Sequence, residues 1–184
     1  MRIVGGRLKG RALQSPGSGA IRPTSDRLRE TVFNILAHSY GNPVAGARVI
    51  DLFAGTGAMA IEALSRGTHF ALFVDQSANA CAIIRANVAA LDLGGAARIL
   101  RRDARKLGPA PEGGSFSLAF LDPPYGKGLV PPTLTALRDG GWLGKDALAV
   151  IEERAGAEVA LPDEFIVRET RRFGATQVVF ASCN

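Results

Sequence analysis

The sequence is poor in several features that would point to particular classes of protein. It has two cysteines, Cys81 and Cys183, which are far apart and show neither metal-ligand spacing nor a disulfide framework. No stretch reaches the roughly 18 unbroken apolar residues that a membrane span needs, and no charged-then-apolar signal follows Met1. We therefore expect a cytoplasmic protein with no metal and no membrane partner.

The apolar content is sufficient for an ordinary globular fold. With 184 residues, 47% of them apolar and 21% charged, the chain can bury one core. From residue 47 onward, short apolar runs alternate with amphipathic segments, which predicts an α/β fold around a mostly parallel sheet. The predicted strands cover residues 47–53, 70–74, 98–100, 117–121 and 147–151, and the predicted helices cover residues 58–66, 77–91 and 129–137. Residues 165–170 and 177–180 predict a terminal antiparallel pair of strands.

The first 46 residues differ in character and predict a small basic extension before a catalytic domain at residues 47–184. A hairpin around a basic turn should precede a helix that Asp26 caps. Residues 1–30 hold seven basic and two acidic residues, whereas the remainder holds fifteen of each. This distribution predicts contact with nucleic-acid phosphates, although a solvated basic segment without a partner would look the same. The residues that we expect to make this contact are Arg7, Lys9, Arg11, Arg22, Thr24, Arg27 and Arg29.

A glycine-rich segment at residues 51–60 follows the first predicted strand and opens a helix. Gly55, Gly57 and Ala60 match the dinucleotide-binding fingerprint, and Asp75 follows where an acid would hold ribose hydroxyls. Taken alone, this match favours a nicotinamide cofactor as readily as any other cofactor that contains a nucleoside. A glycine-rich segment can also form a tight turn that binds no ligand. The loop therefore does not identify its ligand.

Asp51 favours S-adenosylmethionine over a nicotinamide dinucleotide as the cofactor. A carboxylate at this strand end would repel a dinucleotide's pyrophosphate, whereas it would attract the ammonium and sulfonium of S-adenosylmethionine. The alternative is that Asp51 caps the loop's own amides. Asp103, after the third strand, could accept from the adenine amino group or cap a short helix. The residues expected to line the cofactor site are Asp51, Phe53, Ala54, Gly55, Gly57, Asp75, Gln76, Asp103, Ala104 and Asp122.

The tetrapeptide Asp122-Pro123-Pro124-Tyr125 ends the fourth predicted strand, where α/β sheets bind ligands. Asp122 and the Pro123 carbonyl can accept the two N–H groups of a base amine, which orients its lone pair toward a methyl donor. The two prolines stiffen the turn, and Tyr125 offers a ring for base stacking. Asp122, Pro123 and Tyr125 are therefore the candidate catalytic residues, with a Pro-rich strand exit of no function as the alternative.

These motifs together resemble the bacterial RsmD family of small-subunit rRNA guanine-N2 methyltransferases. The resemblance runs from Ile3 to the C-terminal strands and is most specific in residues 22–34, which read RPTSDRLRETVFN. It implies a seven-stranded sheet with a reversed last strand, S-adenosylmethionine as donor, S-adenosylhomocysteine as product and no metal. It also implies a guanine N2 in 16S rRNA as the methyl acceptor. We expect the protein to act as a monomer, and we expect its substrate to be an assembled small ribosomal subunit, because so short an extension leaves little room for target recognition.

Two other functions remain open from the sequence. An adenine-N6 methyltransferase acting on DNA or RNA would carry the same tetrapeptide, because adenine also has an exocyclic amine. An RNA-binding ribosome-assembly factor with a vestigial cofactor pocket would explain the basic extension without catalysis.

Overall fold

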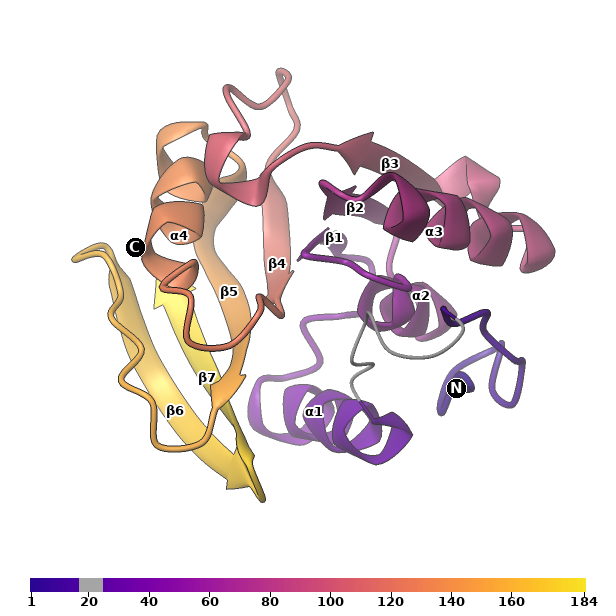
Figure 1. The fold of residues 1–184 in the computed structure, drawn as a ribbon, viewed down its shortest axis with the longest axis horizontal. Helices are drawn as coiled ribbons and strands as arrows, with labels where there is room; N and C mark the ends of the chain where they lie inside the picture. The colour runs from indigo at the N-terminus through magenta and orange to yellow at the C-terminus, as the bar shows by residue number, and fades with distance from the viewer. Residues whose placement is uncertain (17–24) are drawn as a thin grey trace.

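The computed structural model describes residues 1–16 and 25–184, and seven of its strands form one twisted sheet (Figure 1). The strands are β1 (Arg48–Leu52), β2 (Phe70–Asp75), β3 (Ala97–Arg101), β4 (Phe116–Leu121), β5 (Leu143–Arg154), β6 (Phe165–Phe173) and β7 (Thr176–Cys183). Their order across the sheet is β3-β2-β1-β4-β5-β7-β6, and β7 runs antiparallel to both of its neighbours. The predicted fold class, with its reversed last strand, is confirmed.

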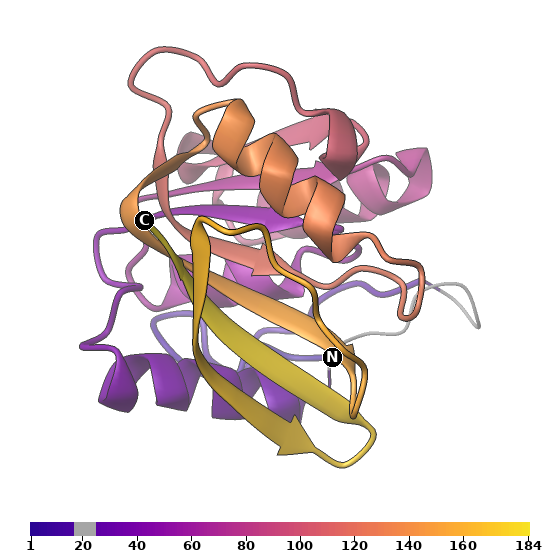
Figure 2. The same ribbon diagram turned by 90° about the vertical axis from the view of Figure 1, so that its left-hand side faces the viewer.

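Helices cover both faces of this sheet, as the two perpendicular views show (Figures 1 and 2). The helices are α1 (Asp26–Ser39), α2 (Ala58–Ser65), α3 (Ala78–Ala90) and α4 (Val130–Asp139), and two single 3-10 turns are η1 (Gly94–Ala96) and η2 (Ala104–Lys106). On one face α4 packs Leu134 and Leu137 against strand residues such as Ile50. On the other face α2 and α3 cover β2, and α1 covers β4, β5 and β7. Burial on both faces explains why the central strands are almost wholly apolar.

Most element boundaries agree with the sequence prediction, and each of the following three differences has a structural cause. Ser25, and not Asp26, caps α1, because its side chain accepts from the Leu28 N–H while Asp26 begins the helix. Strand β5 is longer than predicted because it continues beside β7 to Arg154. The N-terminal hairpin is reduced to one bridge, between Arg2 and Ala12.

Residues 1–14 dock onto α2 and α3 instead of standing away from them. Ile3, Leu8 and Leu13 are buried in the same core cluster as α2 and α3. The backbone of Gln14 exchanges hydrogen bonds with the Asn87 side chain, and the Leu8 N–H donates to Ser65 Oγ at 2.9 Å. Residues 1–14 are thus held against α2 and α3, while the proposed boundary at residue 46 remains a prediction.

Arg29 corrects one of our predictions, because it does not face solvent. Its side chain is 0% exposed and pairs with the equally buried Glu62 and with Asp26. Glu62 also accepts the Val4 N–H at 2.9 Å and pairs with Arg66. Arg29 therefore joins α1, α2 and the N-terminal segment, and the prediction that it contacts RNA is wrong. Arg22 and Thr24 lie outside the described residues.

Two absences concern only the residues that the structure describes. None of their helices is long and apolar enough to cross a membrane. Within the same ranges, no cluster of three or more His, Cys, Asp or Glu side chains could hold a metal ion. Cys81 and Cys183 are buried free thiols, as their spacing predicted.

Candidate active site

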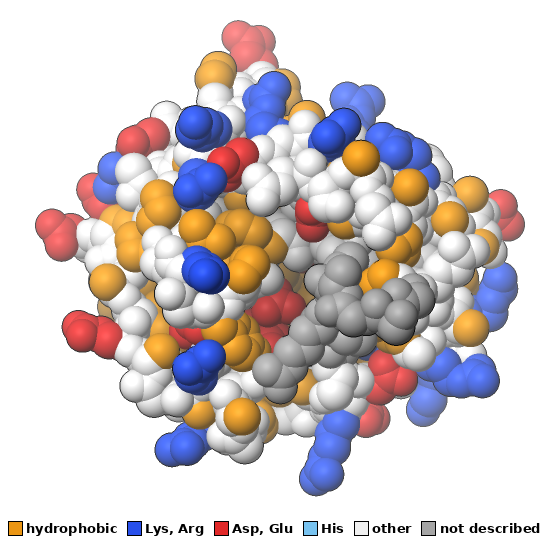
Figure 3. Space-filling view, viewed as in Figure 1, with side chains coloured by type: hydrophobic (Ala, Val, Ile, Leu, Met, Phe, Trp, Pro, Cys, Tyr) orange, Lys and Arg blue, Asp and Glu red, His pale blue; other side chains and the backbone are white. Residues whose placement is uncertain are grey.

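A cavity of about 1100 Å³ opens at the carboxyl ends of the central strands, where an open α/β sheet binds ligands. It extends from β2 and the glycine loop, past β1 and β4, to α1 and the β6–β7 turn. On the surface, acidic side chains are visible at the bottom of this hollow, and several Lys and Arg side chains lie on its left-hand side in this view (Figure 3). One continuous cavity therefore joins the predicted cofactor loop to the predicted tetrapeptide.

The glycine loop turns sharply because three of its residues have positive φ. Phe53, Gly55 and Gly57 have φ of 60°, 56° and 78°, which bends the chain between β1 and α2. Phe53, Ala54 and Gly55 line the cavity. Gly57 lies behind the loop instead, since its N–H donates to Ala54 and an added Cβ would lie 3.0 Å from the Phe73 ring. We therefore revise the predicted role of Gly57 from cofactor contact to support of the loop.

Asp75 is held by the loop that it faces. One carboxylate oxygen accepts the Gly55 N–H at 2.9 Å, and the other accepts the Ser77 N–H at 2.8 Å. A carboxylate has about four lone-pair positions, so these bonds orient Asp75 and leave acceptor capacity for two ribose hydroxyls. Gln76 is exposed beside it and also lines the cavity.

Asp103 lines the far end of the cavity together with Ala104. The alternative that we considered for it is observed, because its side chain caps η2 through the Arg105 N–H at 2.9 Å. It also pairs with the Arg105 guanidinium at 2.6 Å, and these hydrogen bonds lower the pKa of the Asp103 carboxyl. Asp103 thus stays ionised at the cavity wall, where it can also accept from an amino group.

Asp51 is the most deeply buried acid in the cavity wall, with 3% of its surface exposed. Burial raises the pKa of its carboxyl well above the usual range, and the hydrogen bond from the Ala60 N–H, at 3.1 Å, opposes this. The negative charges of Asp122 and Asp75 raise the pKa of Asp51 further. The bond to Ala60 shows that the capping alternative is also part of its role.

The charges around this end of the cavity suit a cation. The carboxylates of Asp51, Asp75 and Asp122 line the same cavity, and burial makes the ionised form of Asp51 unfavourable. A bound ammonium or sulfonium would stabilise these carboxylates, whereas a pyrophosphate would add two further negative charges. The residues present fit S-adenosylmethionine and do not fit a dinucleotide at this position.

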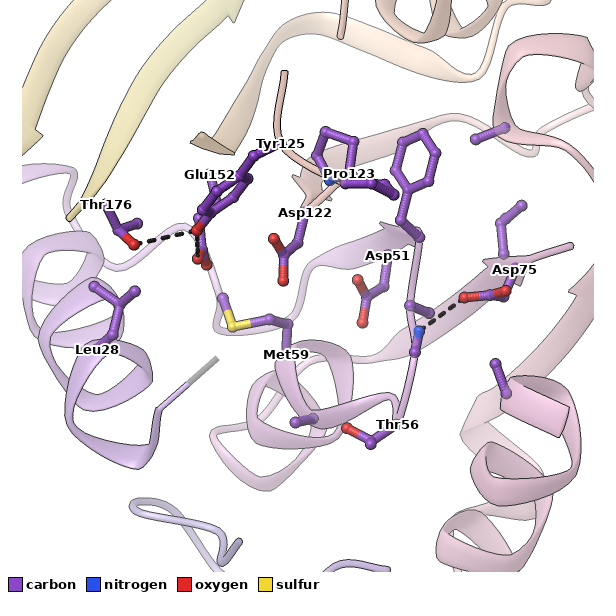
Figure 4. A pocket seen from close by; sticks show the side chains of 18 of the residues that line it. Leu28, Asp51, Thr56, Met59, Asp75, Asp122, Pro123, Tyr125, Glu152 and Thr176 are labelled. Atoms are coloured by element: carbon purple, nitrogen blue, oxygen red, sulfur yellow. Dashed lines mark hydrogen bonds between the residues drawn. The ribbon is translucent and has the colours of Figure 1, made fainter. Parts of the chain in front are cut away.

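The tetrapeptide forms the middle of the cavity, and Asp122, Pro123 and Tyr125 all line it. The Tyr125 hydroxyl donates to Glu152 and lies 3.1 Å from Thr176 Oγ1. Burial and the hydrogen bond to Glu152 raise the pKa of the Tyr125 hydroxyl far above its usual value, so it stays protonated. These bonds fix the ring at the cavity wall, where a base could stack on it (Figure 4).

Several cavity residues were missed by the sequence analysis because they come from distant segments. Helix α1 contributes Leu28 and Thr31, the end of β5 contributes Glu152, and the β6–β7 turn contributes Phe173 and Thr176. Only Glu152 carried a readable signal, because it follows an apolar strand just as Asp122 does. Sequence motifs therefore identify the residues near the glycine loop more completely than the residues at the opposite end of the cavity.

The remaining predicted RNA contacts are placed in two groups. Arg7, Lys9 and Arg11 are exposed on the docked N-terminal segment, where one Arg11 nitrogen donates to the Ala90 carbonyl at 3.0 Å. Arg27 is exposed at the start of α1 and lines the cavity. Arg27 therefore lies at the opening through which a substrate would enter.

Comparison with known proteins gives consistent matches along the chain. A family model described as "Conserved hypothetical protein 95" matches residues 1–182. The "Ribosomal RNA small subunit methyltransferase D" of Escherichia coli K12 is 38% identical over 152 residues, which cover 83% of this chain and 74% of that protein. The "Putative rRNA methyltransferase YlbH" of Bacillus subtilis 168 is 33% identical over 183 residues, covering 97% and 96% of the two chains.

A solved structure shows the same architecture. "Putative methyltransferase yhhF" from Escherichia coli superposes with a TM-score of 0.85 at 30% identity, and the match covers 100% of this chain and 98% of that one. The family model and the match to the Bacillus subtilis relative extend over the glycine loop and the tetrapeptide as well as the N-terminal segment. The chain therefore belongs to the family described as conserved hypothetical protein 95, the RsmD family that its motifs resemble.

Proposed function

We propose that this protein transfers a methyl group from S-adenosylmethionine to the exocyclic N2 of a guanine in small-subunit rRNA. The observation that carries the proposal is the single cavity in which an acidic, cation-accepting end meets the Asp122–Tyr125 turn. The names of the relatives from Escherichia coli and Bacillus subtilis, both rRNA methyltransferases, support the choice of RNA as substrate.

The cofactor would lie along the strand ends of the glycine-loop half. Asp75 would accept from the ribose hydroxyls, Asp51 would face the positively charged methionine end, and Asp103 with Ala104 would meet the adenine. When bound, S-adenosylmethionine supplies an electrophilic methyl group, so the protein needs chiefly to align the acceptor and exclude water.

The acceptor would be held by the tetrapeptide. The Asp122 carboxylate and the Pro123 carbonyl would accept the two hydrogens of the amine, which turns its lone pair toward the methyl donor. Tyr125, with its hydroxyl fixed by Glu152 and Thr176, would support the base by stacking. Asp122 would also take up the proton that the amine loses after transfer.

The test is nucleoside analysis of rRNA from cells that lack the gene and from cells that regain it. Loss of N2-methylguanosine from small-subunit rRNA, restored by the wild-type gene and not by Asp122→Ala, is the expected result. Loss of N6-methyladenosine would favour the adenine enzyme instead. An unchanged nucleoside profile, together with no calorimetric binding of S-adenosylmethionine, would favour the assembly factor.

We also propose that the substrate is an assembled particle, in which a base is already displayed outside a helix. The described N-terminal residues dock on the catalytic unit, so they are not a separate target-recognition domain. Methyl incorporation should be faster into purified small subunits than into naked rRNA. Equal rates would contradict this part of the proposal.

A further inference from the structure

Five acids line the cavity, and four of them form a row along the ends of successive strands. In the proposed reaction, only three of these four would contact the cofactor or the acceptor amine. Asp75, Asp51, Asp122 and Glu152 belong to or directly follow β2, β1, β4 and β5, which are successive strands of the sheet. All four line the same cavity. Figure 4 shows the carboxylates of Asp51, Asp122 and Glu152 pointing into one space. Glu152 stands at the acceptor end of this row, next to Asp122.

The strand register fixes the relation between Asp122 and Glu152. Leu121 pairs with Ile151 in the parallel β4–β5 ladder, so the following residues lie side by side, with their backbones about 5 Å apart. Leu121 and Ile151 pack on the α4 face, whereas Phe120 and Val150 pack on the α1 face. Alternation along a strand then directs both acids to the α1 face, above the same opening.

Two adjacent carboxylates are complementary to the edge of guanine that carries its N1–H and its N2 amine. In guanine the exocyclic N2 amine is next to the N1–H, so this edge presents donors at neighbouring positions. In adenine and cytosine the exocyclic amine is next to an unprotonated ring nitrogen, a neutral acceptor whose lone pair would face the second carboxylate. Such a mismatch places a carboxylate oxygen of Glu152 against a ring-nitrogen lone pair where guanine would supply an N–H donor, and is costly.

We propose that Glu152 is the residue that selects guanine, its carboxylate accepting the base N1–H while Asp122 accepts a hydrogen of the amine. This role rests on the proposed function, because it needs a base amine held at Asp122. The bond that Glu152 accepts from the Tyr125 hydroxyl is compatible with it, because a carboxylate can accept several hydrogen bonds at once. That bond orients Glu152 and the stacking ring together.

The test compares guanosine with 2-aminopurine riboside, which keeps the 2-amino group and lacks the N1 hydrogen. Small ribosomal subunits are reconstituted with rRNA that carries either nucleoside at the mapped target position. Methyl transfer by the full-length protein is measured as kcat/KM. The wild type should prefer guanosine by about 100-fold. In Glu152→Gln the side-chain amide can donate to an unprotonated N1, so the preference should fall below about tenfold.

Tyr125→Phe is the matched control, because it removes the hydroxyl that bonds Glu152 and keeps both the ring and the carboxylate. It should lower the rate on both substrates and retain the preference for guanosine. If Tyr125→Phe loses the preference as Glu152→Gln does, or if Glu152→Gln retains it, Glu152 only anchors the tyrosine and the proposal is overturned.

Three outcomes separate failure of this role from failure of the proposed function. A wild-type preference below about tenfold overturns the role of Glu152 even if its variants fail to fold. A product that mass spectrometry identifies as N6-methyladenosine refutes the proposed function itself, and with it this role. Detection of N2-methylguanosine with no effect of Glu152→Gln on the preference refutes only the role of Glu152.

Discussion

The two ends of the cavity are built in different ways. At the cofactor end, β1, the glycine loop and β2 follow one another in the chain, and backbone N–H groups of the loop and of α2 donate to side-chain carboxylates, as from Gly55 to Asp75 and from Ala60 to Asp51. At the acceptor end, the wall combines the start of α1, the end of β5 and the β6–β7 turn, joined by side-chain contacts such as Tyr125 to Glu152 and Thr176. The cofactor end is therefore built from one continuous stretch of the chain, whereas the acceptor end exists only once the whole sheet has formed.

The largest expected effect separates the two ends by function. Asp122→Ala should reduce the single-turnover rate of methyl transfer by about 10³-fold, because the carboxylate acts on the amine in the transition state. Affinity for S-adenosylmethionine, measured by calorimetry, should change by less than about fivefold. Asp122→Asn, which retains an acceptor oxygen, is the matched control and should lose less. A large loss of cofactor binding in Asp122→Ala would mean that this residue belongs to the cofactor end.

The second prediction concerns the buried ion pairs of Arg29, which hold α1 in place at the acceptor end of the cavity. Arg29→Ala should lower the free energy of unfolding by about 3 kcal/mol, because it removes a fully buried guanidinium that pairs with Glu62 and Asp26 and leaves Arg66 as the only other cation paired with the buried Glu62 among the described residues. Urea denaturation measures the change. Arg27→Ala, two residues earlier in α1 and exposed, should change stability by less than about 0.5 kcal/mol and should instead weaken RNA binding. Similar stability losses in both variants would contradict the structural role of Arg29.

The third effect tests the charge of the cofactor end. Asp51→Asn keeps an acceptor for the Ala60 N–H and removes the negative charge, so cofactor affinity should fall by about 30-fold at neutral pH. The ligand-free variant should nevertheless have a higher Tm than the wild type, because the buried carboxylate is costly in its ionised form. Unchanged cofactor affinity would remove Asp51 from the binding site.

The same residue predicts a pH dependence. The pKa of Asp51 is raised in the folded protein, so its ionisation lowers the stability of the ligand-free protein as pH rises from the ordinary carboxyl range through the raised pKa. Binding of a cation lowers that pKa again, so the cofactor should bind more tightly as pH rises across this window and should release protons. Calorimetry in buffers of different ionisation enthalpy measures the release, which Asp51→Asn should abolish. Equal release from both proteins would exclude Asp51 as its source.

The smallest effect should come from the exposed N-terminal segment. Changing Arg7, Lys9 and Arg11 together to alanine should weaken RNA binding by about tenfold and reduce the slope of log affinity against log salt by about 2, because each phosphate contact releases counterions. Cofactor affinity should stay constant, because these exposed side chains are not part of the cavity wall. A slope equal to that of the wild type would show that these three residues do not contact phosphates.

The sequence predicted the central sheet well because its signals are local. Strands such as Phe70–Asp75 are apolar up to their last residue, and Pro131 and Pro132 fall in the first turn of α4, where proline is tolerated. The end of β5 was less accessible, because residues beyond Ile151 are polar and extend only through pairing with β7. The cap of α1 was misplaced by one residue, since Ser25 and Asp26 have similar capping preferences.

By itself, the sequence determined the glycine loop, its acids and the tetrapeptide, because each is a short segment whose geometry follows from its own backbone. Tertiary structure alone decided that Arg29 lies buried against Glu62 while Arg27 faces the cavity, although both belong to one basic helix start. It also decided that Glu152 stands beside Asp122, thirty residues away in the chain, because strand register sets that distance and local sequence does not. Contacts between distant segments depend on the packing of the whole sheet, and no short stretch of sequence encodes them.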